Sequence, residues 1–157
     1  MAVRMIITGG ENPVLRRETT KVRSFGKEFQ KLVKDLSDTV ESVKGAGLAA
    51  PQVDSSEAVC IAKIGGIFTP LVNPEILWRS EEEVLGEEGC LSLPEIWLYV
   101  PRAVSIVLRY QDESGKEQER RLTDFDARVV QHEVDHLRGI LITDYHGKGA
   151  VVPGEAL

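Results

Sequence analysis

The sequence predicts an α+β fold whose strands are mainly antiparallel, and three observations support this class. Residues 24–45 carry apolar side chains at three- and four-residue steps, the period of an amphipathic helix. Residues 58–122 hold several short β-type runs, and the helical period returns over residues 123–139. Because the strands follow one another, this order favours α+β over a parallel βαβ fold. No repeat or linker-like stretch interrupts the chain, so we expect a single domain over residues 1–157.

The first predicted helix begins near Ser24, whose hydroxyl can cap its N-terminus. Lys44 and Gly45 are expected to end it, because a glycine readily adopts the backbone conformation of a helix stop. The apolar stripe that would face the core consists of Phe25, Phe29, Leu32, Val33, Leu36, Val40 and Val43.

Short strands are expected after this helix. Residues 58–64 form an apolar run that ends at a Gly65–Gly66 turn. The charged run Glu81–Glu83, within residues 75–86, is expected on an exposed strand or loop because three adjacent carboxylates require solvent.

A β-hairpin is expected in the second half of the chain. Residues 103–111 alternate between apolar and polar side chains, residues 112–116 form a turn, and residues 117–122 form the return strand. Residues 140–145 are expected to form a short final strand.

The second predicted helix starts at Thr123 or Asp124 and carries two histidines at a four-residue spacing. His132 and His136 therefore project from one face, one turn apart, and can reach a single metal ion. Glu133 lies about 100° round the helix, close enough to act on a water molecule without binding the metal. This H-E-x-x-H pattern indicates a helical metal site, although two histidines can also coincide on a surface helix.

A third metal ligand is poorly supported downstream of the helix. Metzincin proteases have a third histidine where this chain has Ile142. Glu155 lies in a tail without helical pattern, and His146 is expected in a surface loop. Upstream, residues 86–95 look too irregular for a plain strand and contain Cys90. A thiolate with two imidazoles would leave one coordination position open for water.

The other cysteine and the composition limit the possible functions. Cys60 lies inside an apolar run, where a buried and inert thiol is usual. Two cysteines do not make a disulfide framework, so a reducing compartment is expected. The net charge of −6 argues against binding to nucleic acid. The sequence contains no signal peptide and no apolar run of ~18 residues, which favours a soluble cytoplasmic protein without membrane contact.

Three segments together resemble the signature motifs of the peptide deformylase family. They are GAGLAAPQ at 45–52, EGCLS at 88–92 and QHEVDH at 131–136, in matching order and spacing. The resemblance covers nearly the whole chain and implies antiparallel sheets packed around a central metal-binding helix. It implies a metal-dependent hydrolase that removes the formyl group from the N-terminal formyl-methionine of nascent polypeptides. The implied metal is usually Fe(II), with Zn, Ni or Co possible in the same site.

The resemblance also implies a role for each motif residue. Glu133 would be the general acid/base, while Gln52 and the backbone N–H of Leu91 would hold the oxyanion. Gly47 would offer its backbone to the substrate peptide. The implied metal ligands are Cys90, His132 and His136.

Selection of methionine requires an apolar pocket. The residues expected to line it are Ala46, Glu88 through its carbon stem, Val129 and His132, whereas Gly45 and Gly47 are expected in a loop that the substrate backbone approaches closely. Arg128 is expected either there or on the solvated surface, and Trp97 and Tyr99 either at the groove or in the core. Asp135 cannot face the metal together with the histidines, so we predict that it pairs with Arg102.

Two features of the sequence leave alternatives open. Many family members continue into a C-terminal helix that in some members assists docking at the ribosome. Here Gly147, Gly149, Pro153 and Gly154 predict that this helix is absent or very short, which makes docking doubtful. A zinc endopeptidase and a non-catalytic metal-binding module are the alternative functions. Ile142 argues against the first, and the lack of an evident fourth protein ligand argues against the second.

Overall fold

The computed structural model describes residues 2–154, which form two α-helices, seven strands and three short 3₁₀ helices. The α-helices are α1 (Lys27–Ser42) and α2 (Asp124–Leu137). The strands are β1 (Gly47–Ala49), β2 (Val59–Ile64), β3 (Ile67–Arg79), β4 (Glu83–Cys90), β5 (Leu93–Ala103), β6 (Ser105–Gln111) and β7 (Glu117–Thr123). The 3₁₀ helices are η1 (Pro13–Arg16), η2 (Ala50–Val53) and η3 (Ile142–Tyr145).

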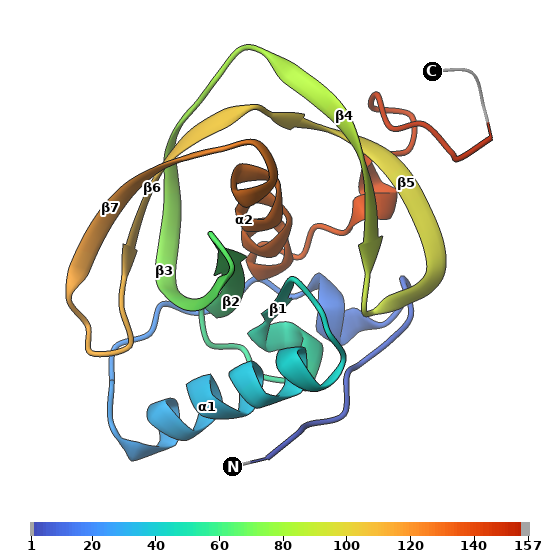
Figure 1. Ribbon diagram of the computed structural model, residues 1–157. Helices are drawn as coiled ribbons and strands as arrows, with labels where there is room; N and C mark the ends of the chain where they lie inside the picture. The colour runs from blue at the N-terminus through green and yellow to red at the C-terminus, as the bar shows by residue number, and fades with distance from the viewer. Residues whose placement is uncertain (1, 155–157) are drawn as a thin grey trace.

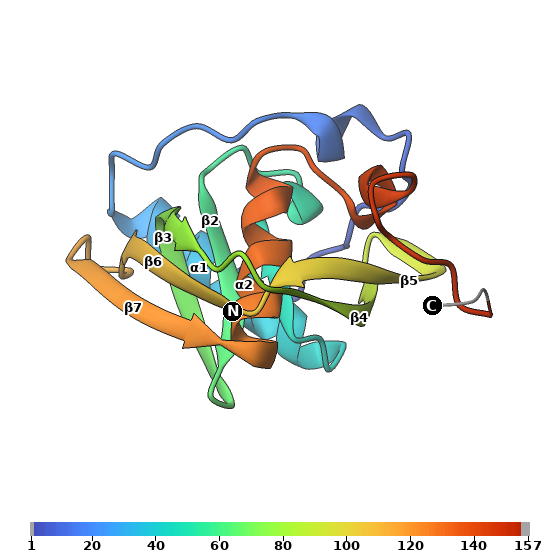
Figure 2. The same ribbon diagram turned by 90° about the horizontal axis from the view of Figure 1, so that it is seen from above.

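Two antiparallel sheets surround α2. One has five strands in the order β1-β2-β3-β6-β7, and the other is the β4-β5 hairpin. In Figure 1, α2 stands at the centre, with β3, β6 and β7 on one side and the hairpin on the other. The view from above in Figure 2 shows the same central position. The predicted α+β fold, with antiparallel sheets packed around a central helix, is therefore confirmed.

Helix α1 packs most of its predicted apolar stripe onto the sheet, but Val43 lies past the end of the helix and is exposed. Phe29, Leu32 and Leu36 are buried in a core cluster that also contains residues of β1 and β2. The predicted cap is wrong: the N-cap is Gly26, which makes no side-chain hydrogen bond, and Ser24 lies two residues too early. The predicted end is confirmed, because the chain leaves the helix at residues 43–45.

Helix α2 has its ends where the sequence places them. Thr123 is the N-cap residue, and the chain leaves the helix before Gly139, which has a φ of 75°. A Cβ atom at Gly139 would lie 2.5 Å from the backbone oxygen of Arg16, so only glycine fits this stop. Ala127, Val130 and other apolar residues of α2 pack against β2 and β6 in a second core cluster.

The predicted strand runs 58–64, 103–111 and 117–122 are confirmed as β2, β6 and β7. In the hairpin turn between β6 and β7, Asp112 Oδ1 accepts hydrogen bonds from the backbone nitrogens of Ser114 and Lys116, at 2.9 and 3.0 Å. The acidic run 81–83 is exposed, as predicted, with residues 81–82 in the connection after β3 and Glu83 at the start of β4.

One sequence expectation is confirmed and another is wrong. Residues 86–95 do not form a plain strand, because β4 shifts its register against β5 between Gly89 and Cys90 and a turn at residues 91–92 separates the two strands. Residues 140–145 form no strand. The backbone nitrogen of Asp144 donates to Leu141 O at 3.0 Å, and the Asp144 carboxylate accepts from the nitrogen of Leu141 at 3.0 Å. These bonds close the 3₁₀ turn of η3.

After η3, residues 146–154 form turns and isolated bridges, one of which joins Val151 to Tyr99. The prediction that the C-terminal helix is absent or very short also covers residues 155–157, among them Glu155. These three residues lie outside the described part of the chain. The weak or absent C-terminal helix thus stays a prediction. No helix within residues 2–154 is both long enough and apolar enough to cross a bilayer.

Candidate metal centre

Cys90, His132 and His136 lie together, although the cysteine is more than 40 positions away in the chain. Strand β4 ends at Cys90, and α2 carries both histidines. The Sγ atom of Cys90 lies 3.3 Å from Nε2 of His136, and one ligand atom from each residue lies within 4.8 Å of the others. The structure therefore contains a candidate metal site at the place that the motifs indicate.

The donor set fits a divalent transition metal. Two ligands of one tetrahedral zinc ion, with bonds of about 2.0–2.3 Å, are separated by about 3.3–3.7 Å, which the sulfur–nitrogen distance matches. The Nδ1 atom of His132 is 2.9 Å from Glu88, so its Nε2 atom is left for a metal. Burial lowers the pKa of His136 well below its ordinary value, and the neutral imidazole is the form that binds metals.

The electrostatics at His132 favour positive charge at the site. Burial opposes the imidazolium form, but hydrogen bonds with Cys90 and Glu88 outweigh it and raise the pKa of His132 to about 10. A divalent ion would supply that positive charge at the same place and would take the nitrogen's lone pair in place of the proton.

The competing residues do not join this site. Cys60 is fully buried in β2, and burial raises the pKa of its thiol, which agrees with the predicted inert role. His146 is exposed on the surface, as predicted.

Glu133 is buried beside the ligands and is poised to exchange a proton. Its side chain is inside the core, and mainly this burial raises its pKa to about 7. Within residues 2–154, its Oε1 atom has no hydrogen-bond partner. A carboxyl group with a pKa near neutrality can accept and return a proton at physiological pH.

Gly47 faces Glu133 across a very short gap. A Cβ atom built on Gly47 would lie 2.6 Å from Glu133 Oε2 and 2.8 Å from its Cγ. The glycine is therefore required for the position of this carboxylate.

We expect Gly47→Ala to lower kcat/KM by about 100-fold, because the new methyl group must displace Glu133 by a large part of an ångström. The measurement is steady-state deformylation, with metal content determined on the same samples. Gly10→Ala is the matched control, since its Cβ atom would make an ordinary 3.6 Å contact with Leu93. Equal rates in both variants would contradict the assigned contact.

The amide of Gln52 is held firmly next to the ligands. Its oxygen accepts a hydrogen bond from the backbone nitrogen of Ala49 at 2.9 Å, and Nε2 donates to Ser92 Oγ at 3.0 Å. Nε2 also lies 3.9 Å from Cys90 Sγ. Ser92 is fully buried. The sequence analysis did not identify it as a site residue, although its position in the EGCLS segment could have indicated this role.

A cavity of about 490 Å³ opens beside the candidate metal site. Trp97 lines it, whereas Tyr99 does not and instead pairs with Val151. His136 lies deeper, with 1% of its surface exposed. The motif and pocket residues that line the cavity are Gly45, Ala46, Gly47, Gln52, Glu88, Cys90, Leu91, Val129, His132 and Glu133.

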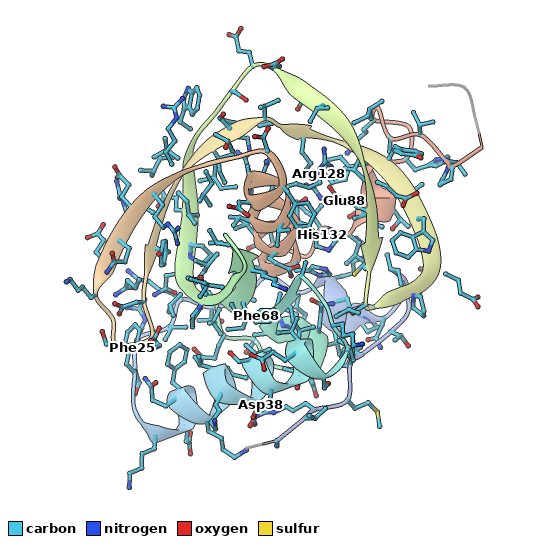
Figure 3. All side chains as sticks on the ribbon, in the orientation of Figure 1. Phe25, Asp38, Phe68, Glu88, Arg128 and His132 are labelled. Atoms are coloured by element: carbon cyan, nitrogen blue, oxygen red, sulfur yellow. The ribbon has the colours of Figure 1, made fainter. Side chains whose placement is uncertain are left out.

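The carboxylate of Glu88 is fixed by nitrogen atoms of three residues. Arg102 donates to both of its oxygens at 2.9 Å, Arg128 donates at 2.6 Å, and His132 Nδ1 lies at 2.9 Å. Burial alone would raise the pKa of Glu88, but the bonds with Arg102 and His132 lower it to about 2. Glu88 thus remains charged and orients a candidate ligand, besides lining the cavity. Figure 3 shows Arg128, Glu88 and His132 together between α2 and β4.

The predicted Arg102–Asp135 pair is confirmed, with Nη1 donating to Oδ2 at 2.6 Å. The hydroxyl of Tyr145 also donates to Asp135, at 2.7 Å. The surface position considered for Arg128 is wrong, because only 8% of the residue is exposed. The contact of Tyr145 was missed, and no local pattern in the sequence indicates it.

We expect Arg102→Met to destabilise the protein by about 3–5 kcal/mol, because it leaves Glu88 and Asp135 buried without their shared cation. Denaturant unfolding measures this loss. Arg109→Met is the control: Arg109 and Glu117 pair at 3.4 Å with both side chains exposed, so about 1 kcal/mol or less is expected. If both variants lost a similar free energy of unfolding, the buried ion pairs of Arg102 would stabilise the protein no more than an exposed pair does.

Antiparallel sheets around an H-E-x-x-H helix, with a cysteine beside the two histidines and a buried glutamate at the cavity, define a metallohydrolase. The chain belongs to the polypeptide deformylase family, whose model matches residues 3–150. It is thus an enzyme of this class, a metal-dependent hydrolase that removes the formyl group from the N-terminal formyl-methionine of nascent polypeptides. The prediction from the three motifs is confirmed, and the endopeptidase and non-catalytic alternatives are not favoured.

Known peptide deformylases match this chain in sequence and in structure over most of its length. A peptide deformylase of Pseudothermotoga lettingae is 42% identical over 135 residues, covering 85% of this chain and 77% of that protein. One from Acidothermus cellulolyticus is 44% identical, covering 92% and 79%. The crystal structure of peptide deformylase from Thermotoga maritima matches with a TM-score of 0.88 at 38% identity, covering 92% of this chain and 97% of that one.

Proposed function

We propose that Cys90, His132 and His136 hold the catalytic metal ion of this deformylase and that Glu133 is its general acid/base. The observation that carries this proposal is the convergence of one sulfur and two imidazoles beside a buried carboxylate at the edge of a cavity. When bound, a divalent ion supplies Lewis-acid chemistry and lowers the pKa of water toward ~7.

Glu133 accepts the proton of the attacking water and passes it to the leaving amine. Such proton transfer contributes about 10²–10⁴-fold to the rate. The raised pKa of Glu133 supports both steps, because a carboxyl group near pKa 7 is neither too weak a base nor too weak an acid.

Gln52 and the backbone N–H of Leu91 stabilise the negative oxygen that develops on the formyl carbon. One N–H of Gln52 is used by Ser92, which fixes the amide, and the second, which makes only a long 3.9 Å contact with Cys90 Sγ, can turn to the substrate oxygen. Fixed donors of this type each contribute about 3–4 kcal/mol in acyl-transfer sites.

The substrate backbone binds along β1. This strand lies at the end of the five-stranded sheet and pairs with β2 on one edge. Gly45, Ala46 and Gly47 line the cavity, so the free edge can add an extended peptide as a further strand. Val129 and the carbon stem of Glu88 then contact the methionine side chain.

We assign Fe(II) as the physiological metal, with Zn(II), Ni(II) or Co(II) able to occupy the same ligands. The proposed substrates are N-formyl-methionyl nascent peptides, and the proposed location is the cytoplasm. Stable ribosome docking is not proposed, since residues 146–154 form turns and isolated bridges.

The test is anaerobic purification, metal analysis, and turnover of formyl-Met-Ala-Ser with formate as the measured product. One metal ion per chain and activity that is lost in air would support a ferrous site with an oxidisable thiolate. Full activity after complete removal of metal by a chelator would overturn the proposal.

A further inference from the structure

Tyr145, the last residue of η3, reaches the network behind the metal ligands although it belongs to none of the three motifs. Its hydroxyl donates to Asp135 Oδ2 at 2.7 Å and accepts from Arg102 Nη1 at 3.1 Å. Burial is the main cause that raises the pKa of Tyr145 to about 12, so the phenol keeps the proton that it donates. One hydroxyl therefore bridges the two charged groups of a buried ion pair.

The guanidinium group of Arg102 is restrained both within its plane and across it. Nε and Nη2 donate to the two oxygens of Glu88 at 2.9 Å each, and Nη1 donates to Asp135 at 2.6 Å. A guanidinium is planar and its N–H groups form a rigid fork in that plane, so these bonds fix the group within the plane. The ring of Tyr145 lies 4.8 Å from the guanidinium carbon and opposes tilting toward the ring.

The position of Arg102 is transmitted to a proposed metal ligand through a single residue. Glu88 Oε1 accepts from Nη2 of Arg102 and also lies 2.9 Å from Nδ1 of His132. The hydrogen bond at the second ring nitrogen of a ligand histidine orients the ring toward the metal. Figure 3 shows Glu88 directed at His132 between β4 and α2. A displaced Arg102 would therefore move the Glu88 carboxylate and turn the His132 ring.

Tyr145 lies apart from the cavity that would hold the substrate. The residues that line the cavity in the described part of the chain do not include Tyr145, Asp135 or Arg102. Arg102 is only 3% exposed, and Tyr145 packs in the core cluster that also contains Leu141 and Ile142. Any effect of Tyr145 on the reaction must therefore pass through the metal ligands and not through contact with the peptide.

We infer that Tyr145 is a positioning residue for the deformylation reaction, which holds Arg102 and Asp135 in place behind the metal site. Through Glu88 it orients the His132 ring toward the ion. The short helix η3 thus belongs to the functional apparatus although it lies outside the motifs. This inference rests on the proposed function, since it requires His132 to be a metal ligand.

The experiment compares Tyr145→Phe, which removes the hydroxyl and keeps the ring, with Tyr99→Phe, the same change on β5 away from the cavity and the network. Co(II) is the probe, and its dissociation constant is measured on metal-free protein by competition with a chelator. Tyr145→Phe is expected to raise this constant by about tenfold, the lower end of the cost of losing a group that orients a ligand. For the loaded enzyme, kcat should fall while KM stays within about twofold, because no substrate contact is lost.

Tyr99→Phe should keep the wild-type dissociation constant and kcat. His132→Ala distinguishes the inference from the proposed function: if it binds Co(II) as tightly as the wild type, the proposed ligand set fails. If His132→Ala loses the metal but Tyr145→Phe binds it as tightly as the wild type, the inference alone is overturned. A lower melting temperature of metal-free Tyr145→Phe with an unchanged dissociation constant and kcat would show a purely structural role and would also overturn it.

Discussion

Glu133→Gln is expected to lower kcat by about 10²–10⁴-fold while the metal content stays at the wild-type level. The amide has nearly the same shape as the carboxyl group, so the buried position beside Gly47 remains filled. It cannot accept the proton of the attacking water, because its nitrogen has no free lone pair for this purpose and its oxygen is a very weak base. The measurement is formate release under anaerobic conditions, with metal analysis of the same preparation.

Glu119→Gln on β7 is the matched control, since it removes one carboxylate from an exposed strand. It should leave both rate and metal content unchanged. A Glu133→Gln enzyme with wild-type turnover would show that another group moves the proton. Loss of metal in that variant would instead show that Glu133 helps to hold the ion.

The elements that determine the metal site could be predicted because their signals are local. The four-residue spacing of His132 and His136 has one geometric consequence on a helix, and the apolar residues around them fix which face is buried. The stop at Gly139 also has a local signal, a glycine directly after the helical period, although the contact with the backbone of Arg16 that requires this glycine is nonlocal.

Cys90 could be predicted only by combining segments. No feature of residues 86–95 themselves indicates that β4 runs past helix α2. The long register with β5, from Glu83 opposite Ala103 to Cys90 opposite Leu93, is a nonlocal pairing. The order of the three motifs indicated that Cys90 belongs with the two histidines. Apolar periodicity could not indicate this, because it describes each segment of the chain separately.

The network behind the ligands was only partly predictable for a similar reason. Arginine side chains are usually exposed to solvent. Arg128 is buried because it donates hydrogen bonds to Glu88 and to the backbone oxygen of Val100 in the β4-β5 hairpin. Likewise, residues 142–145 carry β-type side chains, but they form the turn of η3, which the Asp144 carboxylate closes. Such tertiary contacts override local propensity.

Cys90→Ala is expected to weaken metal binding by more than about 100-fold and to abolish deformylation. Loss of residues that merely orient ligands costs about 10–100-fold in affinity, and removing a ligand costs more. Two imidazoles one helical turn apart remain, but they leave the ion with half of a tetrahedral shell to be filled by water. Chelator competition and metal analysis after dialysis measure the effect.

Cys60→Ala is the informative control, because it makes the same chemical change about 30 residues earlier in the chain. Its thiol is fully buried in β2, so the variant should lose some stability through the small cavity but keep one metal ion per chain. Equal loss of metal in both variants would point to general unfolding, which thermal denaturation of each would reveal. Retention of tightly bound metal by a folded Cys90→Ala protein would exclude the thiolate as a ligand, whatever its distance from His136.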